Sequence, residues 1–154
     1  MGLQLSKQVT ANAVYGSATT TAATYYSDQV DMSGAQGVNF TALFESTAAS
    51  TGTCAFTVVG TDTSTAASTS YTAITGASVS VAASTTANDK RICGIDICDP
   101  QYRYLKAKFV KHAGIIALGC VAQKYGLATE PAAASTTYAA ATAAASFDLV
   151  VGAT

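Results

Sequence analysis

The sequence predicts an all-β fold, an antiparallel sandwich or barrel built as one domain. Short segments with alternating apolar and polar residues recur in the middle of the chain, turn residues separate them, and no segment there has the apolar spacing of a helix. A length of 154 residues fits one domain. We expect the sandwich to span residues 25–126, between an N-terminal arm at 1–24 and a C-terminal arm at 127–154.

The first expected strands follow one another at short intervals. Residues 38–44 alternate, with four apolar side chains on one face, and residues 53–59 alternate in the same way. Residues 71–75 and 77–82 read as two short strands that Gly76 separates. Turns at this spacing are typical of a sandwich or a barrel.

Another strand is expected at residues 90–97, where Cys93, Ile95 and Ile97 align on one face. It ends at Asp99-Pro100, because proline donates no ladder hydrogen bond and restricts the residue before it. This strand begins the part of the chain in which seven of the eight Lys and Arg residues are found.

Residues 102–111 and 115–123 are predicted to form a hairpin. In the first arm Leu105 and Phe109 define the inward face, which Arg103 shares. The outward face carries Tyr102, Tyr104, Lys106 and Lys108. The second arm is apolar on both faces, with Ile115, Ala117 and Val121 on one and Ile116, Leu118 and Cys120 on the other. Such a strand is covered on both sides, so we expect a tail, a loop or another subunit over the second face.

The inward position of Arg103 predicts an ion pair. An unpaired buried charge is very unfavourable, so the guanidinium needs a carboxylate partner. Asp96 and Asp99 are the candidates, because both lie just before the hairpin.

The charge balance gives no global attraction to nucleic acid or to an anionic membrane, because the net charge is −1. A local basic stripe of Lys90, Arg91, Lys106, Lys108 and Lys111, interleaved with tyrosines, forms only if their strands are neighbours. A lysine-bearing edge strand that prevents aggregation explains the same residues. We therefore expect neither nucleic acid nor membrane as a partner.

No membrane span is expected, because the longest apolar run, at residues 113–122, is about half the length that a helix needs to cross a bilayer. No secretory signal is expected either.

No constellation of catalytic residues is evident. His112, the only histidine, lies in a predicted turn, and no nucleophile or orienting acid is placed beside it. The local pairs Asp28 with Asp31 and Asp96 with Asp99 fit turns and strand ends better than a cleft. We expect no catalytic residue, no cofactor and no metal.

The sequence contains four cysteines, Cys54, Cys93, Cys98 and Cys120. Their spacing matches no zinc-binding pattern, and we interpret them as small apolar side chains. The sequence does not determine whether any of them form disulfides.

Two segments resemble a known family. They are VDMSGAQGVNF at residues 30–40 and IDICDPQYRYLK at residues 95–106, which is followed by the apolar strand. Both are similar to small proteins encoded beside the capsid genes of tailed bacteriophages, which pair a Val-Asp-x-x-Gly-x-x-Gly-Val opening with a Pro-x-x-Arg-Tyr hairpin. The resemblance covers about residues 28–126. The Thr/Ser/Ala loop at 61–70 and the tail after Pro131 depart from it.

The resemblance implies a capsid decoration, or cement, protein with a jelly-roll-like β-sandwich. Such a subunit binds the exterior of the major capsid protein shell and copies of itself, as a dimer or trimer, after assembly in the bacterial host cytoplasm. We expect partner contacts from Tyr15, Tyr25, Tyr26, Tyr102, Tyr104, Lys106, Lys108, Ile115, Ala117, Val121, Phe147, Leu149 and Val150. A tail-tube or head–tail joining protein is the alternative. A carbohydrate-binding sandwich is a second one, which the absence of Trp weakens.

Overall fold

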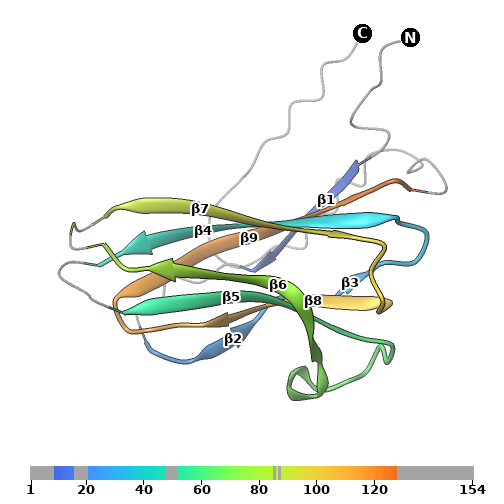
Figure 1. The fold of residues 1–154 in the computed structure, drawn as a ribbon, viewed down its shortest axis with the longest axis horizontal. Coiled ribbons are helices and arrows are strands. Elements are labelled where there is room, and N and C mark those ends of the chain that lie inside the picture. The colour runs from blue at the N-terminus through green and yellow to red at the C-terminus, as the bar shows by residue number, and fades with distance from the viewer. Residues whose placement is uncertain (1–8, 16–20, 48–51, 85, 87, 128–154) are drawn as a thin grey trace, which may run out of the picture.

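Two antiparallel β-sheets pack face to face (Figure 1). The computed structural model describes residues 9–15, 21–47, 52–84, 86 and 88–127. Within these ranges the strands are β1 Val9–Tyr15, β2 Thr24–Tyr26, β3 Val30–Asp31, β4 Gly37–Ser46, β5 Thr53–Thr61, β6 Thr72–Ala82, β7 Lys90–Cys98, β8 Tyr104–Val110 and β9 Ile115–Tyr125, with the short 3-10 helix η1 at Ser68–Ser70.

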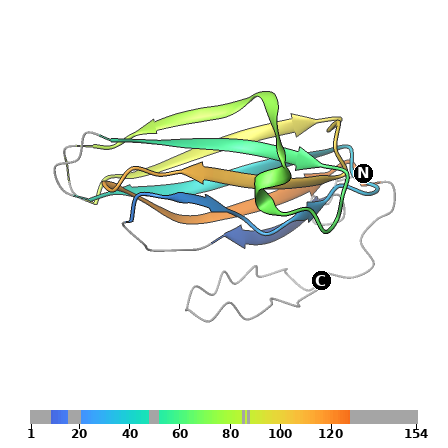
Figure 2. The ribbon, with the colours of Figure 1, turned by 90° about the horizontal axis from the view of Figure 1, so that it is seen from below.

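The strand order is that of a jelly roll. Sheet A has the order β1-β9-β4-β7, and sheet B has the order β2-β8-β5-β6, with β3 also paired to β8. Sheet A is the upper layer of Figure 1, and Figure 2 looks onto sheet B from below. The chain changes sheets at every connection between consecutive strands except β2 to β3 and β5 to β6, which is the double-sheet arrangement of jelly rolls. The predicted all-β, jelly-roll-like sandwich is confirmed.

Phenylalanines from both sheets form the centre of the core. Phe40 and Phe44 come from β4, Phe56 from β5 and Phe109 from β8, and all four side chains are fully buried. The rings of Phe56 and Phe109 stack with centroids 5.3 Å apart, and Phe44 lies 6.0 Å from each. Alternation places these residues inward, and the aromatic contacts then hold the sheets together.

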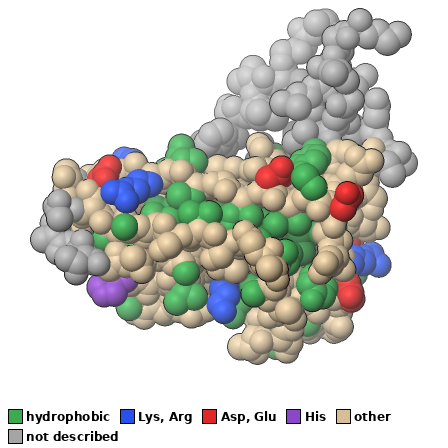
Figure 3. Space-filling model, viewed as in Figure 1, with side chains coloured by type: hydrophobic (Ala, Val, Ile, Leu, Met, Phe, Trp, Pro, Cys, Tyr) green, Lys and Arg blue, Asp and Glu red, His purple; other side chains and the backbone are tan. Residues whose placement is uncertain are grey.

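The core reaches the surface along one side of the sandwich. There β6 and β7 are the edge strands of the two sheets. Figure 3 shows an apolar band on this side, between the upper and lower layers. The half-buried side chains that pack against the core from these strands and the residue after β6 are Ile74, Val79, Ala83 and Cys93.

The predicted hairpin of residues 102–111 and 115–123 is wrong. β8 pairs with β2, β3 and β5 in sheet B, whereas β9 pairs with β1 and β4 in sheet A. The connection at residues 111–114 crosses from one sheet to the other. Alternation indicates which face of a strand is buried but does not specify its pairing partner, and in a sandwich both strands bury a face in the same core.

A β-bulge in β9 explains why the predicted faces of this strand are also wrong. Phe44 pairs with Ala117 and Leu43 with Gly119, so Leu118 is an extra residue and the alternation shifts by one. Ile115 and Ala117 are fully buried, while Val121 lies on the opposite face and is partly exposed. The expectation that these three residues share a face toward a partner is therefore wrong for Ile115 and Ala117.

The N-terminal boundary also differs. β1, within the expected arm of residues 1–24, is a strand of sheet A, so the folded domain begins before residue 25. Tyr15 lies 4.8 Å from the Phe109 ring, and Tyr25 lies 6.3 Å from the Tyr15 ring, so both pack at the core margin. The expected tail anchors Phe147, Leu149 and Val150 lie outside the described residues.

The two strands expected on either side of Gly76 form one strand, β6. Thr57 pairs with Ser78 and Val59 with Ala73, so β6 contains extra residues opposite Val58. Gly76 lies within this irregularity with φ +82°, a left-handed conformation that glycine adopts without strain.

Candidate functional site

The two segments of the sequence resemblance meet at one end of the sandwich. β4 and β7 pair along their length, with Val38 opposite Ile97. The backbone N–H of Met32 donates to Arg103 at 2.8 Å, and that of Asp99 donates to Gln36 at 2.8 Å. Residues of both segments line an open hollow of about 370 Å³, namely Met32, Ser33, Ala35, Asp99, Pro100, Gln101, Tyr102 and Arg103.

Arg103 forms an ion pair at this end, but its partner is Asp31. Arg103 Nε and Nη2 each donate to an Asp31 carboxylate oxygen at 3.1 Å, and the two side chains are 54% and 44% exposed. This bidentate bond lowers the pKa of Asp31, and burial opposes the shift. The predicted buried pair with Asp96 or Asp99 is wrong, because β8 begins at Tyr104 and its alternation does not extend to Arg103.

Asp31 itself connects three strands through its backbone. Asp31 belongs to β3 and lies opposite Tyr104 of β8. Its backbone carbonyl accepts a hydrogen bond from Lys124 Nζ of β9 at 3.1 Å. This residue therefore links the sheet B strands β3 and β8 to the end of sheet A.

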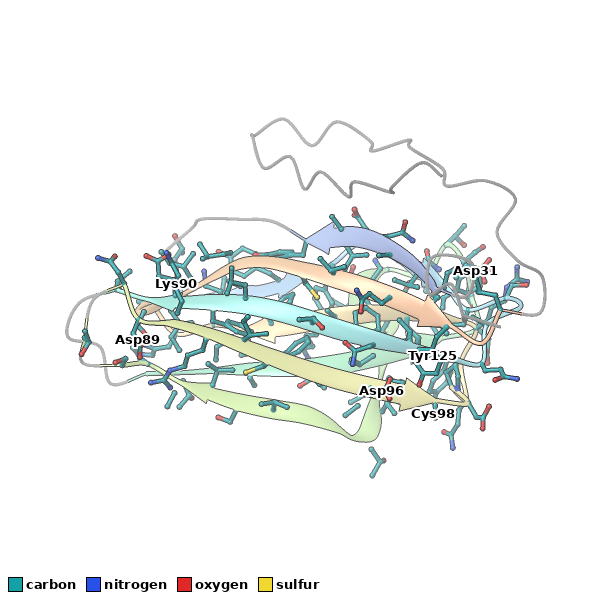
Figure 4. All side chains as sticks on the ribbon, turned by 90° about the horizontal axis from the view of Figure 1, so that it is seen from above. Asp31, Asp89, Lys90, Asp96, Cys98 and Tyr125 are labelled. Atoms are coloured by element: carbon teal, nitrogen blue, oxygen red, sulfur yellow. The ribbon has the colours of Figure 1, made fainter. Side chains whose placement is uncertain are left out.

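A Tyr–Asp–Cys cluster occupies the outer face of sheet A at the same end (Figure 4). The Tyr125 hydroxyl donates to Asp96 Oδ1 at 2.9 Å and lies 3.0 Å from Cys98 Sγ. The hydrogen bond with Cys98, desolvation and the hydrogen bond to Asp96 all raise the pKa of Tyr125. A phenol of this kind keeps its proton and acts as a donor, so the cluster is suited to fixing β9 against β7.

The Tyr125 ring reaches β7 by lying over Gly37 of β4. Gly37 pairs with Tyr125 on one side and with Cys98 on the other, and a Cβ at this position would overlap the ring. Sequence reasoning missed this cluster, because its residues come from β7 and β9, and the sequence does not specify that both strands pair with β4.

The four cysteines are free thiols. Burial raises the pKa of Cys54 to about 11 and that of Cys120 to about 12. These two thiols therefore stay protonated at neutral pH, as expected of small apolar side chains. Cys98 is exposed and Cys93 is half-buried.

Lysine and tyrosine side chains alternate on the outer side of sheet B, and we call this surface the Lys–Tyr face. Lys108 lies 5.9 Å from the Tyr26 ring centre, and Lys106 lies 4.9 Å from that of Tyr71 and donates to Ser68 Oγ at 3.1 Å. The Arg103 guanidinium lies 5.0 Å from the Tyr104 ring centre. The Lys–Tyr face consists of Tyr26, Tyr71, Arg103, Tyr104, Lys106 and Lys108.

The single basic stripe does not form. Lys90 and Arg91 lie on β7 in sheet A, whereas Lys106 and Lys108 lie on β8 in sheet B. Lys111 is buried beside the Tyr25 ring at 5.1 Å, and desolvation lowers its pKa. Tyr102, expected to face outward, is half-buried against the core and lies next to Gly60.

The outer face of sheet A is apolar midway along β7, β4 and β9, and we call this surface the apolar face. Leu43 lies between Ile92 of β7 and Gly119 of β9, and the adjoining row contains Gly94, Thr41 and Val121. Ile92 is 74% exposed. The sequence indicated that β9 carries apolar side chains outward as well as inward, and the half-buried Ile116, Leu118 and Val121 agree with that.

His112 is exposed in the connection between β8 and β9, at the end opposite the Asp31 ion pair (purple in Figure 3). Its backbone N–H donates to Thr53 at 3.2 Å. Among the described residues, no group of three or more His, Cys, Asp or Glu is arranged to hold a metal ion. The same part of the chain contains no helix of the length and hydropathy that a bilayer span requires.

Comparisons with known proteins concern the fold. No protein-family model matches the sequence, and no curated protein matches it. Among solved structures, the fold is similar to the crystal structure of PBSX exported protein XepA, with a TM-score of 0.51 and 14% sequence identity. The match covers 89% of this chain and 43% of that chain, so this chain spans less than half the length of that protein.

Proposed function

We propose that the protein is a bacteriophage structural protein, a decoration subunit that binds the exterior of the major capsid protein shell and stabilises it. The observation that carries the proposal is the junction of the two resemblance segments at one end of a jelly roll. The likeness to a phage PBSX exported protein supports the phage association. In this proposal the protein acts by binding alone, without a cofactor, nucleic acid or membrane.

The Lys–Tyr face and the adjoining hollow are the surface that we assign to the capsid. Interfaces are enriched in Tyr and Arg, and this surface has Tyr26, Tyr71 and Tyr104 beside Arg103. The cations held over these rings suit an acidic capsid surface, since complementary charge steers association and fixes register. A stable contact requires on the order of 1,000 Å² of buried surface.

Repetition explains how a modest contact stabilises a shell. Each bound copy holds neighbouring capsid subunits together, and many copies act in parallel over the lattice. A rigid sandwich suits this role, because a binding surface that is already ordered loses little entropy on binding. The fully buried phenylalanine core provides this rigidity.

The proposal is tested with shells of the phage whose genome encodes the chain, assembled without decoration. We expect the full-length protein to co-sediment with them and to appear on their exterior by electron microscopy. Lys108→Gln should weaken binding at least about threefold, whereas Gln123→Glu, which makes the same charge change on sheet A, should not. Density along the tail would favour the joining-protein alternative, and an absence of binding to any virion component would refute the proposal.

A carbohydrate-binding role is the weaker candidate. Jelly rolls also occur in lectins, and tyrosine rings can bind sugars by stacking. Here the rings of Tyr26 and Tyr71 each have a lysine ammonium within 6 Å of the centre, which occupies the stacking surface. A glycan array probed with the full chain checks this alternative.

A further inference from the structure

We infer that the apolar face of sheet A binds a second copy of this chain, with the two sheets packed face to face about a twofold axis. The inference goes beyond the proposed function and does not rest on it, because it concerns the isolated protein and a surface on the other sheet. Four features of the described residues support it.

The first feature is the position of the exposed apolar residues. Ile92 is 74% exposed and lies directly opposite Leu43 in the sheet register. Val121 lies one row away, opposite Thr41. These side chains form an apolar patch midway along the strands of a sheet face, from the edge strand β7 across β4 to β9, which is typical of a protein–protein contact.

The second feature is a glycine that the fold does not require. Gly94 lies in the middle of β7, its φ is outside the left-handed region, and the nearest atom to an added Cβ would be 3.9 Å away. Glycine weakens a strand, and in strands it often marks the close approach of another backbone. Here it leaves a gap beside the projecting Ile92.

The third feature is that the face is complementary to itself. The outward residues of β7 are, in order, Lys90, Ile92, Gly94, Asp96 and Cys98. A second copy running in the opposite direction, with the twofold axis near Cys93, places Ile92 of one copy over Gly94 of the other. The same contact then occurs twice, as an isologous interface requires. On β4 the same operation places Leu43 over Thr41.

The fourth feature is the charge at the two ends of this strand (Figure 4). The same operation brings Lys90 of each copy opposite Asp96 of the other. Glu45 lies opposite Lys90 in the register of one sheet. The same operation places Glu45 over Asn39 of the other copy, so Glu45 does not face a like charge. Both charged side chains are exposed at the rim, where such pairs define register more than they add affinity. Sheets packed face to face deviate by about 30°, which keeps the long side chain of Lys90 within reach of Asp96.

Sedimentation equilibrium of the full chain, without shells, tests the inference. We expect a reversible dimer, and we expect Ile92→Glu to raise its dissociation constant at least about tenfold, or about 1.4 kcal/mol. The matched control is Val110→Glu, because Val110 is the other exposed large apolar residue of the described chain and lies on sheet B. This control should leave the dissociation constant unchanged.

Two further variants separate the dimer contact from a folding effect. Gly94→Val should raise the thermal stability of the monomer, because a β-branched residue favours a strand, and yet weaken the dimer by filling the gap. Lys90→Asp and Asp96→Lys should each weaken the dimer, and the double variant should restore it.

Three results would overturn the inference. One is a wild-type chain that stays monomeric up to about millimolar concentration, a range that includes even weak specific complexes. Another is a double charge variant that is as weak as either single variant. The third is a chain ending at residue 127 that dimerises while the full chain does not, because the segment after residue 127 would then be the occupant of this face.

Discussion

The two outer faces of the sandwich differ in chemistry although they enclose the same core. On sheet B, Lys106 and Lys108 lie over tyrosine rings, so the charge is held at fixed positions. On sheet A, Ile92, Leu43 and Gly94 lie midway along β4 and the edge strand β7, with Lys90 and Asp96 toward the two ends of β7. We therefore propose two kinds of partner: a charged surface for sheet B and a closely packed apolar surface for sheet A.

The largest effect should come from the residue on which both faces depend. Phe109 on β8 contacts Phe44 of sheet A and Phe56 of sheet B. Phe109→Ala should lower the free energy of unfolding by about 3–5 kcal/mol, because it leaves a cavity where the sheets meet. Val110→Ala, at the neighbouring exposed position, should change it by less than about 0.5 kcal/mol. Urea denaturation measures both, and equal losses would contradict the assignment of the core.

Two glycine variants compare how closely the side chains pack at the end of sheet A and midway along it. Gly37→Ala places a methyl group in the Tyr125 ring and should cost about 1–3 kcal/mol of stability. Gly94→Ala meets no atom closer than 3.9 Å and should be neutral or stabilising. Thermal unfolding under dilute, monomeric conditions compares them. A larger loss for Gly94→Ala would refute the open position assigned to that glycine.

Removing one hydroxyl tests the cluster that closes the same end. Tyr125→Phe loses the hydrogen bond to Asp96 and the contact with Cys98 but keeps the ring over Gly37. We expect a loss of about 0.5–1.5 kcal/mol in the free energy of unfolding. The Lys–Tyr face should be unaffected, so binding to shells should not change. The chemical-denaturation midpoint and co-sedimentation report the two quantities separately.

The smallest effect concerns the Asp31 ion pair. Its bond to Arg103 lowers the pKa of Asp31 in the folded state, so the stabilisation is present above the unfolded-state pKa of about 3.9 and is lost as the pH falls through the folded-state pKa. Asp31→Asn should lower the melting temperature slightly at about pH 7. The difference should disappear below the folded-state pKa of Asp31, where both states bind the proton.

High salt should also reduce the Asp31 effect, because both side chains of the pair are about half exposed. A difference in melting temperature that persists at low pH would mean that the asparagine disturbs β3 itself.

The sequence predicts the inward and outward faces of individual strands well. Leu105, Ala107 and Phe109 are fully buried, as the alternation in β8 indicates, and Lys106 and Lys108 lie on the other face. The end of β7 before Asp99-Pro100 is also correct. Alternation predicts these features because one buried face fixes the direction of every second side chain.

The sequence does not predict which strands pair or where the alternation shifts. The β8–β9 connection reads as a hairpin, because a short turn between two alternating segments looks the same whether it stays in one sheet or crosses to the other. The bulge at Leu118 moves Val121 to the outer face. Arg103 precedes β8, so its pairing depends on β3, a two-residue strand. The Tyr125 cluster requires the register of three strands.

The pairing of the first described strand with the last described strand has a consequence for synthesis on the ribosome. β1 hydrogen-bonds to β9, with Val9 opposite Tyr125, and β2 hydrogen-bonds to β8. Sheet A therefore cannot be completed until translation has passed residue 125, and such distant contacts make folding slow. During that interval the nascent polypeptide exposes unpaired strand edges, so chaperone capture should favour a high yield of native protein.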